Sequence, residues 1–257
     1  MSLNLLLRNS YHYDLPKELI AQYPADKREA SRLMHLDRQV GSIEHKNFTD
    51  ILDILSEGEV LVLNNSKVFP ARLFGTKENG SKIEVFLLHP TDRNTWKCLV
   101  HPGKRLKEAQ WLQFSDDFSG YIETSDYEGI REIRFEYQGD FWDKIFRVGH
   151  IPLPPYIART DDKSDIERYQ TVYAKELGSV AAPTAGLHFS SSILDKLKEK
   201  GVIITELTVH VGVGTFRPVK TETITEHTMH RECAEITQEA ADTINCAKRE
   251  GRRVVAV

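Results

Sequence analysis

Two segments in the second half of this sequence each combine a histidine with glycines and hydroxyl side chains. The first, residues 178–189 (GSVAAPTAGLHF), directly precedes a helix start at Ser190. Small side chains allow a ligand to approach the backbone, and the unpaired N–H groups of a helix start can bind an anion. His188 would then lie at the edge of a binding site. A tight turn, packed for steric reasons, is the alternative explanation.

The second segment, residues 207–218 (LTVHVGVGTFRP), alternates in the way a strand does. The alternation places Thr208, His210, Gly212 and Gly214 on one face. Glycine weakens a strand, so two glycines on one polar face need an explanation. A ligand that lies against this face would provide one. A bulge or close packing against another strand is the alternative. The segment lacks the third glycine and the following helix of a dinucleotide fingerprint.

A histidine pair follows in residues 226–232 (EHTMHRE). His227 and His230 would share one face of a helix and could ligate zinc, with Cys233 close by. The spacing is not that of a His-Glu-x-x-His motif, and no second pair completes four ligands. A structural or substrate-binding role is therefore favoured over a metal site.

Residues 64–72 (NNSKVFPAR) follow an unbroken apolar run at residues 60–63. Such a run is typical of a strand buried on both faces, and α/β sheets gather their ligands where these strands end. Asn64, Asn65 and Arg72 would supply neutral and cationic hydrogen bonds. Alternatively, the segment only connects two domains, and its asparagines form hydrogen bonds with the backbone of the turn.

These segments lie within two regions of different predicted secondary structure. Helices alternate with strands at both ends of the chain, which predicts an α/β layer. The predicted helices are residues 14–20, 49–58, 190–200 and 238–250, and the predicted strands are residues 32–37, 60–63, 202–211 and 253–257. Residues 69–146 contain short alternating runs separated by turns, which indicates a small barrel or sandwich. We therefore expect a discontinuous α/β domain (residues 1–68 and 150–257) with an inserted β-barrel domain (residues 69–149). Three prolines in residues 151–156 mark the return from this insertion.

Composition limits the class of protein. The 257 residues carry 34 Lys+Arg and 38 Asp+Glu, a net charge of −4, and are 40% hydrophobic, which is typical of a soluble globular protein. The odd number of three cysteines argues against a disulfide framework and fits a reducing cytosol. No apolar run approaches the ~20 residues of a membrane span. The charge argues against general nucleic-acid binding, but not against a local basic patch formed by Lys77, Lys82, Lys97, Lys104, Arg105 and Lys107.

Six motifs, in this order, resemble the S-adenosylmethionine:tRNA ribosyltransferase-isomerase family of queuosine biosynthesis, from about Tyr13 to the last residue. They are residues 64–72, 151–157, 168–173, 181–189, 208–219 and 227–232. The resemblance implies an α/β domain with a β-barrel insertion, as the patterns predict. Family members continue well past the position of Val257, so we expect part of the α/β domain and of the substrate site to lie beyond it.

The activity implied by this resemblance is transfer and isomerisation of the ribosyl part of S-adenosylmethionine. The acceptor would be the aminomethyl group of the 7-deazaguanine preQ1 at the wobble position of tRNA. The products would be epoxyqueuosine-tRNA, adenine and methionine. The resemblance implies no metal or prosthetic group, because S-adenosylmethionine is consumed as a substrate. It also implies a cytoplasmic enzyme without membrane contact. The sequence does not determine the oligomeric state, and we expect a monomer.

Such a reaction needs a base that removes the proton beside the sulfonium and a donor that protonates the leaving adenine. His188 and His210 are the leading candidates, followed by Tyr169, because a neutral imidazole or a phenol suits each step. The hypothesis requires both imidazoles to line one pocket. The candidates for substrate binding are Asn64, Asn65, Arg72, Thr184, Gly186, Gly212, Gly214, Thr215, Arg217, His227, His230 and Glu232.

Within this set, Asn64, Asn65 and Arg72 would hold the deazaguanine edge or a phosphate. His227, His230 and Glu232 would bind ribose hydroxyls, and the small residues would allow close approach of the backbone. Two other functions remain open. A zinc-dependent hydrolase would use His188, His210, His227 and His230, and a non-catalytic RNA-binding module would use the basic patch of the β domain.

Overall fold

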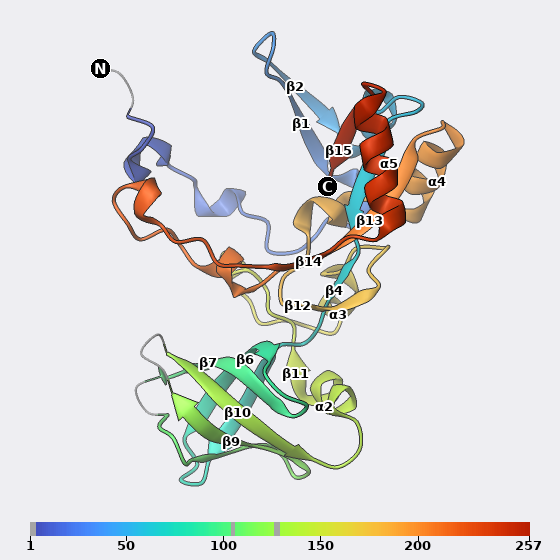
Figure 1. Ribbon diagram of the computed structural model, residues 1–257. Helices are drawn as coiled ribbons and strands as arrows, with labels where there is room; N and C mark the ends of the chain where they lie inside the picture. Colours follow the sequence, from blue (N-terminus) through green and yellow to red (C-terminus); the bar gives the residue numbers. More distant parts are fainter. Residues whose placement is uncertain (1–3, 104–105, 126–128) are drawn as a thin grey trace.

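The computed structural model describes residues 4–103, 106–125 and 129–257, and it has two parts (Figure 1). An α/β part contains both ends of the chain, and a β barrel is built from its middle. The predicted fold class, an α/β layer with an inserted β barrel, is confirmed. Lys104 and Arg105 of the predicted basic patch lie outside the described residues. None of the helices in the described ranges is long and apolar enough to cross a membrane.

The α/β part is organised around β3 (Val60–Asn64), which is buried at every residue. β13 (Ile203–His210) and β15 (Val254–Ala256) run parallel to it on either side, and β14 (Cys233–Glu235) pairs antiparallel with β13. Leu61 and Leu63 pack with the side chains of helix α4 (Ser191–Glu199). Val60 and Val62 pack with Ala247 of helix α5 (Gln238–Arg249). Because helices cover both faces, the sequence of β3 shows no alternation.

Side-chain caps begin both helices at the predicted places. The hydroxyl of Ser190 accepts a hydrogen bond from the backbone N–H of Ile193 at the start of α4. Thr237 accepts one from Ala240 at the start of α5. Such caps satisfy N–H groups that have no partner within the helix. The predictions for residues 190–200 and 238–250 are thus confirmed.

Three other predictions about local structure are wrong. Residues 14–20 contain only the 3-10 turn η2 (Lys17–Leu19), whose residues are all exposed, and so short a segment needs tertiary packing to be a helix. The predicted helix 49–58 is reduced to η4 (Phe48–Asp50) and α1 (Ile51–Ile54), beginning after Asn47 rather than at Thr49. The predicted strand face from residue 208 to 214 ends with β13 at His210, and Val213–Phe216 form the 3-10 turn η7.

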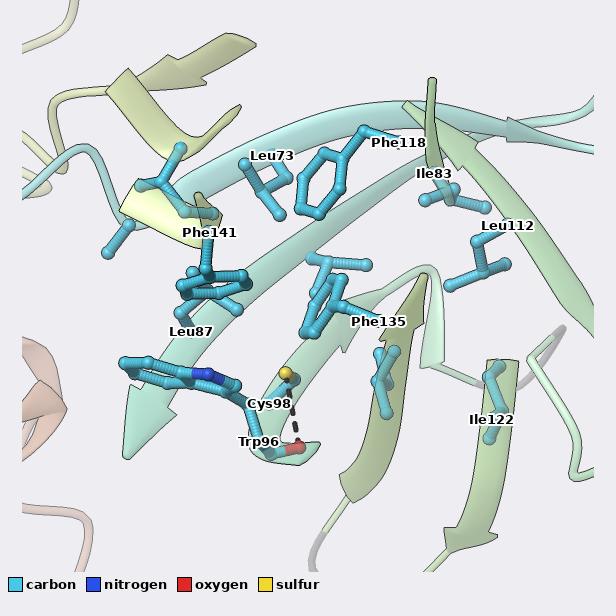
Figure 2. Packing of buried hydrophobic residues seen from close by; sticks show 14 of the residues in the cluster. Leu73, Ile83, Leu87, Trp96, Cys98, Leu112, Phe118, Ile122, Phe135 and Phe141 are labelled. Carbon is cyan, nitrogen blue, oxygen red and sulfur yellow. Dashed lines mark hydrogen bonds between the residues drawn. The ribbon is translucent and has the colours of Figure 1, made fainter. Parts of the chain in front are cut away.

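The barrel consists of six strands that follow one another along the chain. They are β5 (Arg72–Lys77), β6 (Lys82–Pro90), β7 (Thr95–His101), β8 (Trp111–Ser115), β9 (Phe118–Ser125) and β10 (Ile130–Tyr137). Their order is β5-β6-β7-β10-β9-β8, and pairing of β5 with β8 closes the barrel. Figure 2 shows its aromatic core, in which the rings of Phe118 and Phe135 stack with centroids 5.4 Å apart.

The chain enters and leaves the barrel at one point. It enters after β4 (Ser66–Val68), which pairs in parallel with β12 (Glu176–Ser179), and leaves through helix α2 (Phe141–Val148) and β11 (Gly149–His150), which pairs with β5. A Cβ on Gly149 would lie 2.3 Å from the carbonyl oxygen of Pro70. The two connections are therefore in backbone contact, which leaves no room for a side chain at Gly149.

The remaining elements lie at the edges of the α/β part. β1 (Arg32–Asp37) and β2 (Ser42–Asn47) form an antiparallel hairpin. The shorter elements are η1 (Arg8–Tyr11), η3 (Arg28–Ala30), α3 (Asp165–Arg168), η6 (Thr184–His188) and η8 (Ile224–Glu226). An isolated bridge between Leu7 and Thr223 joins the N-terminal segment to the segment that precedes β14.

Candidate active site

A cavity of about 540 Å³ lies between the barrel and the α/β part. Its volume falls in the range of small-molecule sites. The barrel side consists of Leu88, His89, Pro90, Trp96, Ile130 and Trp142. The α/β side consists of Leu177, Gly178, Val180, residues 210–214, Arg217 and residues 230–233. The cavity thus combines an aromatic and apolar wall with imidazoles, two guanidinium groups and a carboxylate.

His210, at the end of β13, packs against the backbone of Gly178. A Cβ on Gly178 would lie 2.7 Å from both Nδ1 and Cε1 of the imidazole. Nδ1 is buried and has no hydrogen-bond partner in the described part of the chain. The bare backbone of Gly178 therefore fixes the position of the His210 ring at the cavity wall.

A second glycine and histidine pair lies on the same side of the cavity. A Cβ on Gly214 would lie 2.8 Å from the Cβ of His230. Gly212 differs, because a Cβ there would meet no atom within 4 Å. Its backbone N–H donates a hydrogen bond of 3.1 Å to Oε1 of Glu232. Gly212 thus leaves open space beside a carboxylate whose position is held by the backbone.

The barrel supplies residues that the sequence analysis did not select. The indole rings of Trp96 and Trp142 contact each other edge to face with centroids 5.8 Å apart. Burial, and to a smaller extent the charge of Lys97, lowers the pKa of His89, so its imidazole is neutral near pH 7. No spacing motif marks these residues, and the sequence analysis placed them only within the inserted β domain.

Six of the predicted site residues line this cavity: His210, Gly212, Gly214, Arg217, His230 and Glu232. The others do not line it: Asn64, Asn65, Arg72, Tyr169, Thr184, Gly186, His188, Thr215 and His227. The structure therefore brings together the two C-terminal motifs and leaves the 64–72 and 181–189 motifs outside the cavity.

His188 lies in a different environment from His210. Its Nδ1 is 3.0 Å from the hydroxyl of Ser31, and its ring centroid is 5.4 Å from that of Phe48. Burial lowers the pKa of His188, partly offset by a hydrogen bond involving the backbone of Arg28. The hypothesis that His188 and His210 line one pocket is not supported, because the turn of η6 directs the chain toward the core under Phe48.

The asparagines bond to protein groups. Asn64 donates to the carbonyl of Val209 and accepts from the backbone N–H groups of Val209 and Ser66. Asn65 donates to Glu206 and accepts from the hydroxyl of Thr208. Their amides therefore join β3 to β13, the strand that ends at His210.

Arg72 and the predicted small and hydroxyl residues are also placed apart from the cavity. The guanidinium of Arg72 pairs with Glu84 within the barrel at 2.7 Å. Thr184 and Gly186 belong to η6, and a Cβ on Gly186 would lie 2.1 Å from the hydroxyl of Tyr173. Thr215 is an exposed residue of η7. Glycine at 186 is required here by packing against Tyr173.

Two tyrosines of the 168–173 motif are buried. Burial raises the pKa of Tyr169 to about 12 and raises that of Tyr173 further. Both phenols are neutral near pH 7, and the raised pKa makes each a weaker acid than an ordinary tyrosine, so the burial does not favour Tyr169 as an acid or a base.

The histidines are not arranged as the alternative function, a zinc-dependent hydrolase, would require. His227 follows η8 in an irregular segment, so it does not share a helical face with His230. Over the described ranges, no group of three or more His, Cys, Asp or Glu side chains is arranged to hold a metal ion. The alternative of a zinc-dependent hydrolase therefore has no geometric support.

Comparison with known proteins adds independent information. Residues 8–257 match a family described as queuosine biosynthesis protein. This chain belongs to that family. It is 53% identical over 251 residues to the S-adenosylmethionine:tRNA ribosyltransferase-isomerase of Clostridioides difficile, covering 96% of this chain and 72% of that protein. It is 50% identical over 249 residues to the protein of that name from Desulfitobacterium hafniense, with the same coverage.

A crystal structure of S-adenosylmethionine tRNA ribosyltransferase from Thermotoga maritima is also similar. The sequences are 33% identical, the alignment covers 95% of this chain and 67% of that one, and the TM-score is 0.41. Membership of the queuosine biosynthesis family confirms the resemblance seen in the six motifs.

Proposed function

We propose that this chain acts as an S-adenosylmethionine:tRNA ribosyltransferase-isomerase. It would transfer and isomerise the ribosyl group of S-adenosylmethionine onto preQ1 in tRNA, with release of adenine and methionine. Relatives that are 53% and 50% identical carry this enzyme's name. The observation that carries the proposal within the structure is the cavity, which joins His210, Glu232 and an aromatic wall in one space.

The aromatic wall suits the sulfonium cation of S-adenosylmethionine. A cation over the face of a tryptophan is attracted by the ring quadrupole, and Trp142 lines the cavity. Arg217 and Arg231 line the same space and can pair with the carboxylate of the methionyl part. The cavity therefore offers complementary groups to both charged ends of this substrate.

His210 is our candidate for the base that removes the proton beside the sulfonium. Because its Nδ1 is buried against Gly178, Nε2 is the nitrogen that remains to meet a substrate. His230 also lines the cavity and is the candidate for protonating the leaving adenine. Glu232, whose carboxylate is held by the N–H of Gly212, is suited to accept hydrogen bonds from ribose hydroxyls.

The test is to incubate the protein with preQ1-containing tRNA and S-adenosylmethionine and to measure free adenine. For His210→Gln we expect the rate to fall about 10²–10⁴-fold, as for loss of a general base, with both substrates still bound. His45→Gln, at an exposed position of β2, is the matched control and should react at the native rate. RNA binding without adenine release by the wild-type chain would favour the non-catalytic alternative instead.

A further inference from the structure

His210 lies beyond the point where β13 loses its pairing with β3. The register between these two strands ends at Leu207 and Asn64. After Asn64 the chain continues into β4, which pairs with β12 instead. On its other side, His210 pairs with Cys233 of β14. On the side that β3 leaves, the end of β13 must therefore be held by groups other than the backbone of β3.

The side chain of Asn64 takes the place of that backbone at Val209. Its Oδ1 accepts a hydrogen bond from the N–H of Val209, and its Nδ2 donates to the carbonyl of Val209, both at 3.0 Å. A side-chain amide has one acceptor and two donors, so it can bind both groups of a peptide as a neighbouring strand does. Asn64 is buried, so water competes little for these bonds. The residue before His210 is thus held from the end of β3.

Ser179 of β12 holds the residue that follows His210. Its hydroxyl accepts from the N–H of Val211 at 2.9 Å and donates to the hydroxyl of Ser66 at 2.8 Å. The carbonyl of Val211 accepts from the N–H of Val180 at 3.0 Å. Both serines are completely buried. The two backbone polar groups of Val211 are therefore bound by consecutive residues of the chain at the end of β12.

These bonds form a closed circuit around His210. The Oδ1 of Asn64 also accepts from the N–H of Ser66 at 3.1 Å, which links the two halves. Buried hydrogen-bond networks of this kind rigidify the segments that they join. In order, the circuit contains Val209, Asn64, Ser66, Ser179 and Val211, and the backbone of His210 completes it.

The three side chains of this circuit lie behind the His210 ring and outside the cavity. Gly178, against whose backbone the ring packs, directly precedes Ser179 in β12. The residues that line the cavity do not include Asn64, Ser66 or Ser179. These side chains therefore do not meet a substrate in the cavity, and they can influence it only through the residues that they hold.

We propose that Asn64, Ser66 and Ser179 are positioning residues that fix the direction of the His210 imidazole at the cavity wall. A general base must lie within hydrogen-bond reach of the proton that it removes, and a displacement of about 1 Å can cost about 10²-fold in rate. The catalytic part of this inference rests on the proposed function, in which His210 is the base. The part that concerns the position of the ring does not.

The first test separates kcat from KM in the adenine assay. Ser179→Ala leaves the N–H of Val211 without its acceptor, so we expect kcat to fall at least about tenfold and KM for S-adenosylmethionine to change less than about threefold. Ser66→Ala keeps the hydroxyl of Ser179 and should show the same pattern with a smaller fall, so it replaces Ser179→Ala if that variant does not fold. Thr237→Ala also removes a hydroxyl that accepts from a backbone N–H, but at the start of α5, and should keep the native kcat.

A double-mutant cycle tests whether the effect passes through His210. If Ser179 acts by positioning this imidazole, Ser179→Ala should slow the wild type but should not slow His210→Gln further. An equal fall of kcat in both backgrounds would overturn the proposal, because the network would then act through stability or through another group.

The last test observes the ring itself and needs no activity. The imidazole nitrogen signals of His210 in isotope-labelled protein are assigned by their loss in His210→Gln. Ser179→Ala should shift these signals, and Thr237→Ala should not. Unchanged signals in Ser179→Ala would overturn the positioning role. Shifted signals, together with a wild type that releases no adenine, would support the positioning role and contradict only the proposed reaction.

Discussion

The imidazole of His210 lies directly on the backbone of Gly178, with no space for a side chain between them. The φ angle of Gly178 is +155°, a conformation that residues with a Cβ rarely adopt, and an added Cβ would lie 2.7 Å from Nδ1 of His210. A glycine on β12 is thus needed both for the local backbone and for the position of a histidine on β13.

Gly178→Ala should therefore displace His210 and strain the backbone. We expect a loss of about 1–3 kcal/mol of stability and at least a tenfold slower release of adenine. Thermal unfolding and the adenine assay would measure the two effects. Gly212→Ala is the matched control for stability, because a Cβ there meets no atom within 4 Å. A Gly178→Ala protein with the melting temperature and rate of the wild type would contradict the inferred role of this contact.

Glu232 should act through its carboxylate rather than through its packing, since it is an exposed residue whose Oε1 accepts from the N–H of Gly212. Glu232→Gln retains an oxygen acceptor for that N–H but loses the charge, whereas Glu232→Ala loses both. We expect little change in stability for either and a larger rise in KM for S-adenosylmethionine in Glu232→Ala than in Glu232→Gln. Equal and native KM values in both variants would remove Glu232 from the binding site.

The sequence was sufficient for those elements whose own residues determine them. The unbroken apolar run of β3, the caps Ser190 and Thr237, and the alternation of the barrel strands are local signals, and each produced the expected element. The helix predicted at residues 14–20 did not form, because local signals alone are not sufficient for so short a segment. Its local signals were present, but no apolar surface covers it, and a helix of that length is not stable without packing.

The site was only partly predictable, because its geometry depends on contacts between distant residues. β13 ends at His210 because the next two N–H groups bond to side chains far away in sequence: Val211 donates to the hydroxyl of Ser179, and Gly212 donates to Glu232. Alternation in the sequence could not reveal this. The placement of Trp96 and Trp142 in the cavity depends likewise on how the barrel is attached to the α/β part.

The lowered pKa of His188 predicts a dependence of stability on pH. A histidine whose pKa is lower in the folded than in the unfolded state binds fewer protons when folded. Its contribution to stability is therefore retained above the unfolded pKa of about 6.5 and is lost as the pH falls below it. We expect the free energy of unfolding to fall between pH 7 and pH 5, and we expect His188→Gln to show a smaller fall.

Urea titrations at these pH values would measure the free energy of unfolding of both proteins. A variant with the same pH dependence as the wild type would contradict the assignment to His188. His89, whose pKa is also lowered, would account for part of the residual dependence.

The junction between the barrel and the α/β part should tolerate no side chain at Gly149. A Cβ there would lie 2.3 Å from the carbonyl oxygen of Pro70 and 2.5 Å from that of Ile145, and neither backbone group can move as a flexible side chain would. Gly149→Ala should lower the free energy of unfolding by about 1–3 kcal/mol, as other overpacking substitutions do. Gly103→Ala, where a Cβ meets no atom within 4 Å, is the matched control within the barrel segment. Because the cavity is walled by both parts, displacement of the junction should also raise KM for S-adenosylmethionine, and a destabilised variant with native KM would show that the cavity does not depend on this contact.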